Sequence, residues 1–257
     1  MKAFFRHDGL DFHYLDEGRG RPFVFQHGLG ADTGQPAGLF RPPDGVRLLA
    51  LDCRGHGETR PLGDPAKLCF DVFADDLAAL LDHLGVERAV IGGTSMGAGI
   101  ALNFALRYPR RTAGLVLSRP AWLDEPMPPH LAVFPEVARA IRAHGVGKAR
   151  EMFRHRPDVA AQFDGPRAEE TVAKLERIPA DAPNRDRRAW ASLRLPVLVL
   201  GNRDDIIHPF AFAEELARSI PGAELREITP KSADAALHAA QVQASIRTFL
   251  NQQTIPC

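Results

Sequence analysis

The sequence has few cysteines, no long apolar run and no excess of charge of either sign. Its three cysteines, Cys53, Cys69 and Cys257, are too few and odd in number for a disulfide framework, so we expect reduced thiols, with Cys257 the most exposed. No apolar run approaches the roughly 18 residues of a membrane span. Residues 1–8 lack the apolar core of a signal peptide, and we therefore expect a cytoplasmic location and no membrane partner.

Charge and motif content exclude further classes of protein. The chain has 32 Lys and Arg residues against 32 Asp and Glu residues, which argues against nucleic acid as a partner. A phosphate-binding Gly-x-x-x-x-Gly-Lys-Ser/Thr pattern is absent, as is any Cys/His cluster with metal-ligand spacing. We expect a small-molecule substrate and neither a metal nor another cofactor, and nothing in the sequence indicates an oligomeric state.

Short apolar runs alternate with amphipathic segments along most of the chain. Short runs of mainly apolar residues predict buried strands, and they lie at or within residues 23–26, 46–51, 87–92, 114–118, 195–200 and 223–228. Helical spacing of apolar residues follows several of these runs, as at Phe73, Leu77, Leu80 and Leu84. Strands that alternate with helices predict an α/β fold with a mostly parallel sheet covered on both faces.

One segment breaks this alternation. Residues 119–192 contain prolines and charged helical pieces but no convincing buried strand. The sequence therefore predicts a core built from residues 1–118 and 193–257, with a helical lid at 119–192 that begins at the carboxyl end of a strand. The alternative is a solvated helical decoration with no role at the site.

A glycine-rich turn supplies the candidate nucleophile. Gly93-Thr94-Ser95-Met96-Gly97 fits Gly-x-Ser-x-Gly, and it stands between an apolar run and a predicted helix that ends at Pro109. The pattern is typical of a nucleophile elbow, a tight turn whose close backbone contacts leave no room for a Cβ at the glycines. We expect Ser95 to be a nucleophile that needs a neighbouring base.

Four motifs in order resemble those of the α/β-hydrolase superfamily, and the resemblance covers nearly the whole chain outside the lid. They are His27-Gly28-Leu29-Gly30, Asp52-Cys53-Arg54-Gly55-His56-Gly57, the Ser95 turn, and Asn202-Arg203-Asp204-Asp205-Ile206-Ile207-His208-Pro209. The resemblance implies an eight-stranded core, a Ser-Asp-His triad in that chain order, and acyl-transfer chemistry. It also implies that the backbone N–H groups of Leu29 and Met96 form the oxyanion hole, and that His27 holds its loop in place.

The resemblance also guides the choice of the acid. In the family pattern the acid lies four residues before a proline, which selects Asp205 because Pro209 follows it, with Asp204 as the alternative. A carboxylate at this position accepts the imidazole N–H and fixes its tautomer.

The base is where the sequence departs from the family. A Gly-His pair is expected about seventeen residues before the Phe-Leu that ends the last helix, but counting back from Phe249 leads to Ser232. We assign the role to His238, on the condition that its helix begins near Ala239. The competing interpretation makes His238 an ordinary helix residue. His208, in the same turn as Asp205, is interpreted as a turn or lid contact.

Two functions follow from these assignments. The first is a serine hydrolase of a carboxylic ester, lactone or related acyl bond, in which Ser95, His238 and Asp205 form the triad and Trp122 contributes to substrate binding. The second, favoured by the missing Gly-His pair, is a non-catalytic or non-hydrolytic protein that binds a small molecule under the lid. A haloalkane dehalogenase is disfavoured, because that enzyme has an aspartate where this chain has Ser95.

Overall fold

The computed structural model describes residues 2–163 and 167–252, and these residues form one eight-stranded sheet. Its strands are β1 (Ala3–His7), β2 (Leu10–Gly18), β3 (Arg21–Gln26), β4 (Val46–Leu51), β5 (Ala89–Thr94), β6 (Thr112–Ser118), β7 (Val197–Gly201) and β8 (Ala223–Glu227). Their spatial order is β1-β2-β4-β3-β5-β6-β7-β8, and only the β1·β2 and β2·β4 pairs are antiparallel. The predicted mostly parallel α/β sheet is confirmed.

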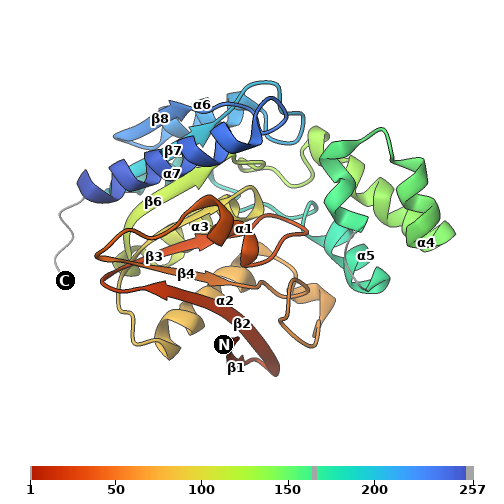
Figure 1. Cartoon of the computed structure of the whole chain (residues 1–257), viewed down its shortest axis with the longest axis horizontal. Helices are drawn as coiled ribbons and strands as arrows, with labels where there is room; N and C mark the ends of the chain where they lie inside the picture. Colours follow the sequence, from red (N-terminus) through yellow and green to blue (C-terminus); the bar gives the residue numbers. More distant parts are fainter. Residues whose placement is uncertain (1, 164–166, 253–257) are drawn as a thin grey trace.

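Helices cover both faces of this sheet, as Figure 1 shows. They are α1 (Gly34–Leu39), α2 (Phe70–His83), α3 (Met96–Arg107), α6 (Phe210–Ser219) and α7 (Ala235–Gln252), with short 3-10 helices η1 (Pro65–Lys67) and η2 (Pro109–Arg111). Along β3, Phe23 and Phe25 pack with residues of α7, whereas Val24 packs with residues of α2 and α3. Because successive strand residues point to opposite faces, a strand that is apolar throughout is buried between two helical layers.

Residues 119–192 form a separate group of helices, which we call the helical insertion. Its elements are η3 (Pro129–Leu131), α4 (Val133–Met152), η4 (Pro157–Phe163), α5 (Ala168–Arg177) and η5 (Arg187–Ser192), and its described residues contain no strand. The backbone of α4 is interrupted at Gly145, which has a φ of +78°. In Figure 1 both long helices stand beside the sheet, with α5 closer to it than α4.

The register of the central strands brings their carboxyl ends to one edge. Gln26 of β3 pairs with Gly93 of β5, and Thr94 pairs with Ser118 of β6. Ser118 in turn pairs with Leu200 of β7. The loops that follow these four strands therefore start side by side, which is where ligands bind in open α/β sheets.

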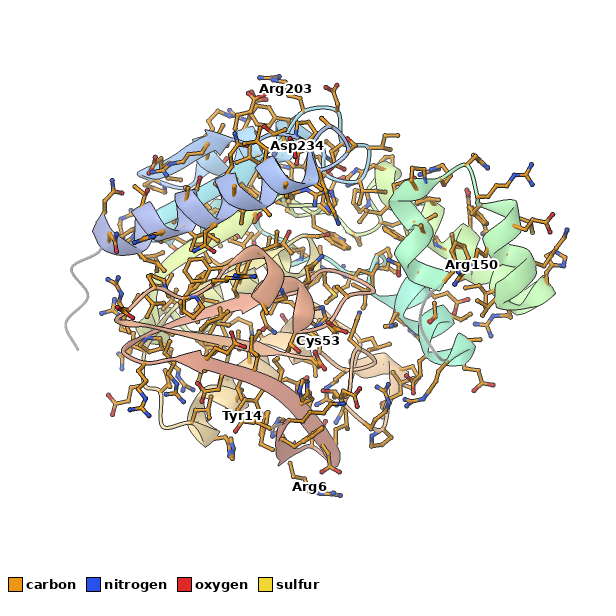
Figure 2. All side chains as sticks on the ribbon, viewed as in Figure 1. Arg6, Tyr14, Cys53, Arg150, Arg203 and Asp234 are labelled. Atoms are coloured by element: carbon orange, nitrogen blue, oxygen red, sulfur yellow. The ribbon has the colours of Figure 1, made fainter. Side chains whose placement is uncertain are left out.

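Two further features of the described residues concern the thiols and the length of the helices. Cys53 and Cys69 are free thiols, and Figure 2 shows Cys53 in the interior of the molecule. The third cysteine, Cys257, lies outside the described residues. No helix of the described chain is long and apolar enough to cross a membrane.

Candidate active site

Ser95 lies on a strained turn between β5 and α3. Its φ of +56° and ψ of −115° are unfavourable for a residue with a side chain. A Cβ on Gly93 would lie 2.3 Å from the Gly97 carbonyl carbon, and a Cβ on Gly97 would lie 2.3 Å from the Gln26 carbonyl oxygen. Both positions therefore require glycine, and the turn has the geometry that the Gly-x-Ser-x-Gly pattern predicts.

The turn after β3 packs directly against Ser95. A Cβ on Gly28 would lie 3.3 Å from the Cβ of Ser95. Buried His27 holds this turn, since its Nδ1 lies 2.8 Å from the Gly28 carbonyl oxygen and its Nε2 accepts from the backbone N–H of Cys53 at 3.1 Å. Leu29 follows Gly28, and Met96 is the first residue of α3, so its N–H has no acceptor within the helix. Both predicted oxyanion donors thus belong to backbone segments beside Ser95.

His208 bridges Ser95 and Asp205. Its Nε2 lies 2.9 Å from Ser95 Oγ, and its Nδ1 lies 3.0 Å from Asp205 Oδ1. The imidazole and the carboxylate are both largely buried, with side chains 11% and 14% exposed. The serine hydroxyl, the imidazole and the carboxylate are therefore connected by two hydrogen bonds, an arrangement that can activate a serine hydroxyl.

A tight turn after β7 makes this bridge possible. Asp205 Oδ1 accepts hydrogen bonds from the backbone N–H groups of Ile207 and His208, each at 3.1 Å. These bonds fold the chain back on itself, so that a histidine only three residues beyond the acid reaches Ser95. Asp204 is exposed and has a φ of +56°, so the structure brings Asp205 rather than Asp204 to the imidazole.

The structure does not bring His238 to Ser95. Helix α7 begins at Ala235, and the backbone N–H of His238 donates to the Asp234 carbonyl at 3.0 Å, so the helix does not start near Ala239 as the sequence-based choice required. Figure 2 shows Asp234 at the start of this helix. The His238 ring is buried and bonds through Nδ1 to the Thr229 carbonyl oxygen at 2.8 Å.

The interpretation of His208 as a mere turn contact is therefore wrong on geometry. The family's usual position for the base lies after β8, so counting to that position could not reveal a histidine in the turn after β7. The signal available in the sequence was His208 itself, which lies one residue before Pro209 in the motif that carries the acid.

A further cation, missed in the sequence, completes the cluster. Arg119 follows β6 with a φ of +48°, and one of its terminal nitrogens lies 2.5 Å from Asp205 Oδ2 and 2.9 Å from His208 Nδ1. Its side chain is 16% exposed. The available signal was an arginine directly after a strand that ends at the ligand-binding edge of the sheet.

The environment shifts the pKa of both titratable members. Burial, followed by the positive charge of Arg119, lowers the pKa of His208 to about 4, against the opposing effect of Asp205. For Asp205, burial acts to raise the pKa, but the hydrogen bond and charge of His208 and the charge of Arg119 outweigh it and hold the pKa well below its usual range. At neutral pH the imidazole is therefore uncharged and the carboxyl group is ionised.

Trp122 lies where the helical insertion begins, and it is buried. Its ring packs edge-on against Phe70, with the ring centroids 5.3 Å apart, and its indole nitrogen has no hydrogen-bond partner in the described chain. The described residues contain no group of three or more His, Cys, Asp or Glu side chains placed to hold a metal ion.

Comparisons with known proteins agree with this geometry. The family model for the alpha/beta hydrolase fold matches residues 21–157. A 2-hydroxy-6-oxononadienedioate/2-hydroxy-6-oxononatrienedioate hydrolase of Paraburkholderia phymatum is 30% identical over 84% of this chain and 82% of its own length. A bifunctional esterase/perhydrolase of Acinetobacter calcoaceticus is 40% identical over a shorter stretch, 40% of this chain and 38% of the relative.

A solved structure extends the similarity to almost the whole chain. A thermophilic esterase from Thermogutta terrifontis superposes with a TM-score of 0.74 at 27% identity, and the match covers 98% of this chain and 96% of the esterase.

Proposed function

The chain belongs to the α/β-hydrolase family, and from that premise we propose that it hydrolyses a carboxylic ester, lactone or related acyl bond through an acyl-enzyme on Ser95. One observation carries the proposal: the hydrogen-bonded chain from Ser95 Oγ through both nitrogens of His208 to Asp205. Two of the similar proteins, from Acinetobacter calcoaceticus and Thermogutta terrifontis, are esterases.

In the first half of the reaction, Ser95 Oγ attacks the carbonyl carbon of the substrate and His208 Nε2 takes the hydroxyl proton. The carbonyl oxygen becomes an oxyanion, which the backbone N–H groups of Leu29 and Met96 stabilise by about 3 kcal/mol each. The tetrahedral intermediate then collapses, and the imidazolium gives its proton to the leaving alkoxide. An ester of Ser95 remains.

In the second half, a water molecule replaces the leaving alcohol. His208 removes a proton from this water as its oxygen attacks the acyl carbon, and it later returns the proton to Ser95 Oγ. The products are a carboxylic acid, an alcohol and the free enzyme. For a lactone both groups stay in one hydroxy acid.

Arg119 and Asp205 prepare His208 for this role. An Nδ1–H that donates to Asp205 Oδ1 leaves the Nε2 lone pair directed at the Ser95 hydroxyl, which is the tautomer a base requires. Arg119 binds the other carboxylate oxygen, so the acid stays ionised and in place. The same positive charge disfavours protonation of His208 before the serine proton arrives.

The helical insertion supplies the remaining elements of the proposal. As a lid it would close over the substrate pocket and keep bulk water out while the substrate binds, and the single water of the second half-reaction would enter once the alcohol has left. Trp122 stands at its first residues, and the apolar ring with a free indole N–H suits contact with the acyl part of a substrate.

The alternative of a non-catalytic binding protein depended on the missing Gly-His pair. His208 supplies an imidazole at Ser95 by another route, which removes the reason for preferring that alternative.

Intact-mass measurement with a fluorophosphonate tests the proposal. We expect one adduct on the wild type and on His238→Ala, and none on Ser95→Ala or His208→Ala. A wild type that stays unlabelled, while a control serine hydrolase is labelled in the same buffer, contradicts an activated Ser95. Labelling that is lost in His238→Ala but kept in His208→Ala would reverse the assignment of the base.

A further inference from the structure

A polar hollow lies beside the turn that contacts Ser95. It has a volume of about 450 Å³ and opens between Gly30 of that turn, Gly55 and Arg60 of the loop after β4, and Glu170, Thr171 and Lys174 of α5. Figure 1 shows α5 on the side of the helical insertion that faces the core. The hollow thus lies between the helical insertion and the turns after β3 and β4.

Lys174 is the unusual residue of this hollow. It is only 8% exposed, and its side chain packs against Gly55, where a Cβ would lie 3.3 Å from Lys174 Cδ. Within the described residues its ammonium group makes neither a hydrogen bond nor an ion pair. Burial lowers the pKa of Lys174 to about 8, with Glu170 acting in the opposite direction. The group is therefore still mainly charged at neutral pH, and it is a cation on a largely buried side chain that has no counter-ion in the described chain.

The acidic groups around the hollow are already engaged. Glu170 pairs with Arg167 at 2.8 Å and lies 3.9 Å from Arg60, while Glu58 pairs with Lys2 at 3.2 Å. Exposed Asp32 accepts a hydrogen bond from the backbone N–H of Gly34 at 2.8 Å. Among the largely buried groups that the structure describes at the hollow, the charge left without a counter-ion is therefore the positive charge of Lys174.

A second polar group nearby also lacks a partner. Burial and then the charge of Lys174 hold the pKa of His56 well below its usual range, and the side chain of Lys174 packs against Gly55, the residue before His56. His56 Nδ1 bonds to the Arg54 carbonyl oxygen at 2.9 Å, so the ring is neutral and its buried Nε2 has a lone pair without a donor. A hydroxyl group or a water molecule beside a bound anion would satisfy it.

The hollow and Ser95 share the same turn. Gly28 faces Ser95, and Gly30, two residues later, lines the hollow, a separation of at most about 7 Å along the chain. Gln162 of η4 donates to the Leu29 carbonyl oxygen at 3.1 Å, so the helical insertion is bonded to the residue between them. The side chain of Gln162 also packs against Gly30, so it and the turn form the boundary between the hollow and Ser95.

We propose that this hollow binds the carboxylate of a small organic acid, with Lys174 as its counter-ion. The proposal rests on the proposed function and specifies its substrate class, which is an ester or lactone that also bears a free carboxylate. The same carboxylate chemistry would accept a separate organic acid, and the kinetic experiment below distinguishes the two sources.

Calorimetric titration with glutarate tests the site without any chemistry. At about pH 6.5, where Lys174 is charged, we expect wild type and Ser95→Ala to bind glutarate, and Lys174→Met to bind it about tenfold more weakly or worse. Lys148→Met is the matched control, since Lys148 is exposed and paired with Glu151. Equal binding by Lys174→Met, or no binding by wild type, overturns the proposal. Because Ser95→Ala is included, a failure of the hydrolase proposal leaves this result intact.

Steady-state kinetics then identify the source of the carboxylate. The substrates are mono-(4-nitrophenyl) glutarate and its uncharged methyl ester. If the carboxylate belongs to the substrate, Lys174→Met raises KM about tenfold for the acid and leaves KM for the methyl ester unchanged. If glutarate binding is lost but neither KM changes, the site takes a separate acid. The Tm of Lys174→Met should stay close to that of wild type, because methionine keeps the apolar packing of the side chain and no ion pair of the described residues is lost. Lys174→Gln replaces it if Lys174→Met does not fold.

Discussion

Two histidines near the end of the chain occupy opposite kinds of position. His208 lies in a turn after β7 and touches both Ser95 and Asp205, whereas His238 lies inside α7, and the one hydrogen bond of its ring to the described residues joins it to the Thr229 carbonyl oxygen. Both are buried and both have a lowered pKa. Burial and pKa therefore do not distinguish a candidate base from a structural histidine. The contact of the second ring nitrogen does distinguish them, because His208 Nε2 lies against Ser95 Oγ.

The largest expected difference between the two histidines is in catalysis. Replacing His208 with Ala removes the only imidazole bonded to Ser95 in the described chain, and we expect kcat/KM on 4-nitrophenyl acetate to fall by about 10,000-fold or more. His238→Ala should change it by no more than about threefold. Equal losses of kcat/KM in His208→Ala and His238→Ala would contradict the assignment of His208 as the base.

The two adjacent aspartates sharpen the comparison. Asp205→Asn should lower kcat by about 100- to 10,000-fold, because an amide can donate to His208 Nδ1 and so stabilise the wrong tautomer. Asp204→Asn is the matched control, since Asp204 is exposed and asparagine tolerates its positive φ. We expect the kcat of Asp204→Asn to equal that of the wild type. A greater loss from Asp204→Asn would transfer the acid role to that residue.

The charge of Arg119 gives His208 a pH dependence that activity can report. The imidazole of His208 must be neutral to act as a base, so activity is complete above its pKa and lost as the pH falls through it. Arg119 lowers that pKa, so Arg119→Met should move the acid limb of kcat/KM to higher pH. The expected loss at about pH 5 is up to tenfold relative to the plateau. Arg119→Lys keeps the charge and should move the limb less, and an unmoved limb in Arg119→Met contradicts the assignment.

The comparison also shows what the sequence could and could not predict. Glycine-flanked turns after apolar runs predicted the edge of the sheet where Ser95 and Asp205 meet, because parallel strands end together. The identity of the base could not be predicted. His208 reaches Ser95 because the backbone N–H groups of Ile207 and His208 donate to Asp205 Oδ1 and close a turn, and neither composition nor the spacing of apolar residues predicts such bonds to a side chain. Arg119 was missed for the same reason, since its partners are distant in sequence.

The smallest effect is on stability, and it belongs to His238. Replacing His238 with Leu keeps an apolar side chain in place but leaves the Thr229 carbonyl without this donor, so we expect a loss of about 1 kcal/mol in the free energy of unfolding. Burial lowers the pKa of His238, so unfolding takes up a proton and the wild type loses stability as the pH falls below about 6.5. Leucine has no such proton, and the difference between the two proteins should therefore narrow in acid. Urea denaturation at several pH values measures this, with His144→Ala, an exposed position on α4, as the control. A difference that grows in acid would mean that the ring is charged in the folded protein, and His238 would then need another partner.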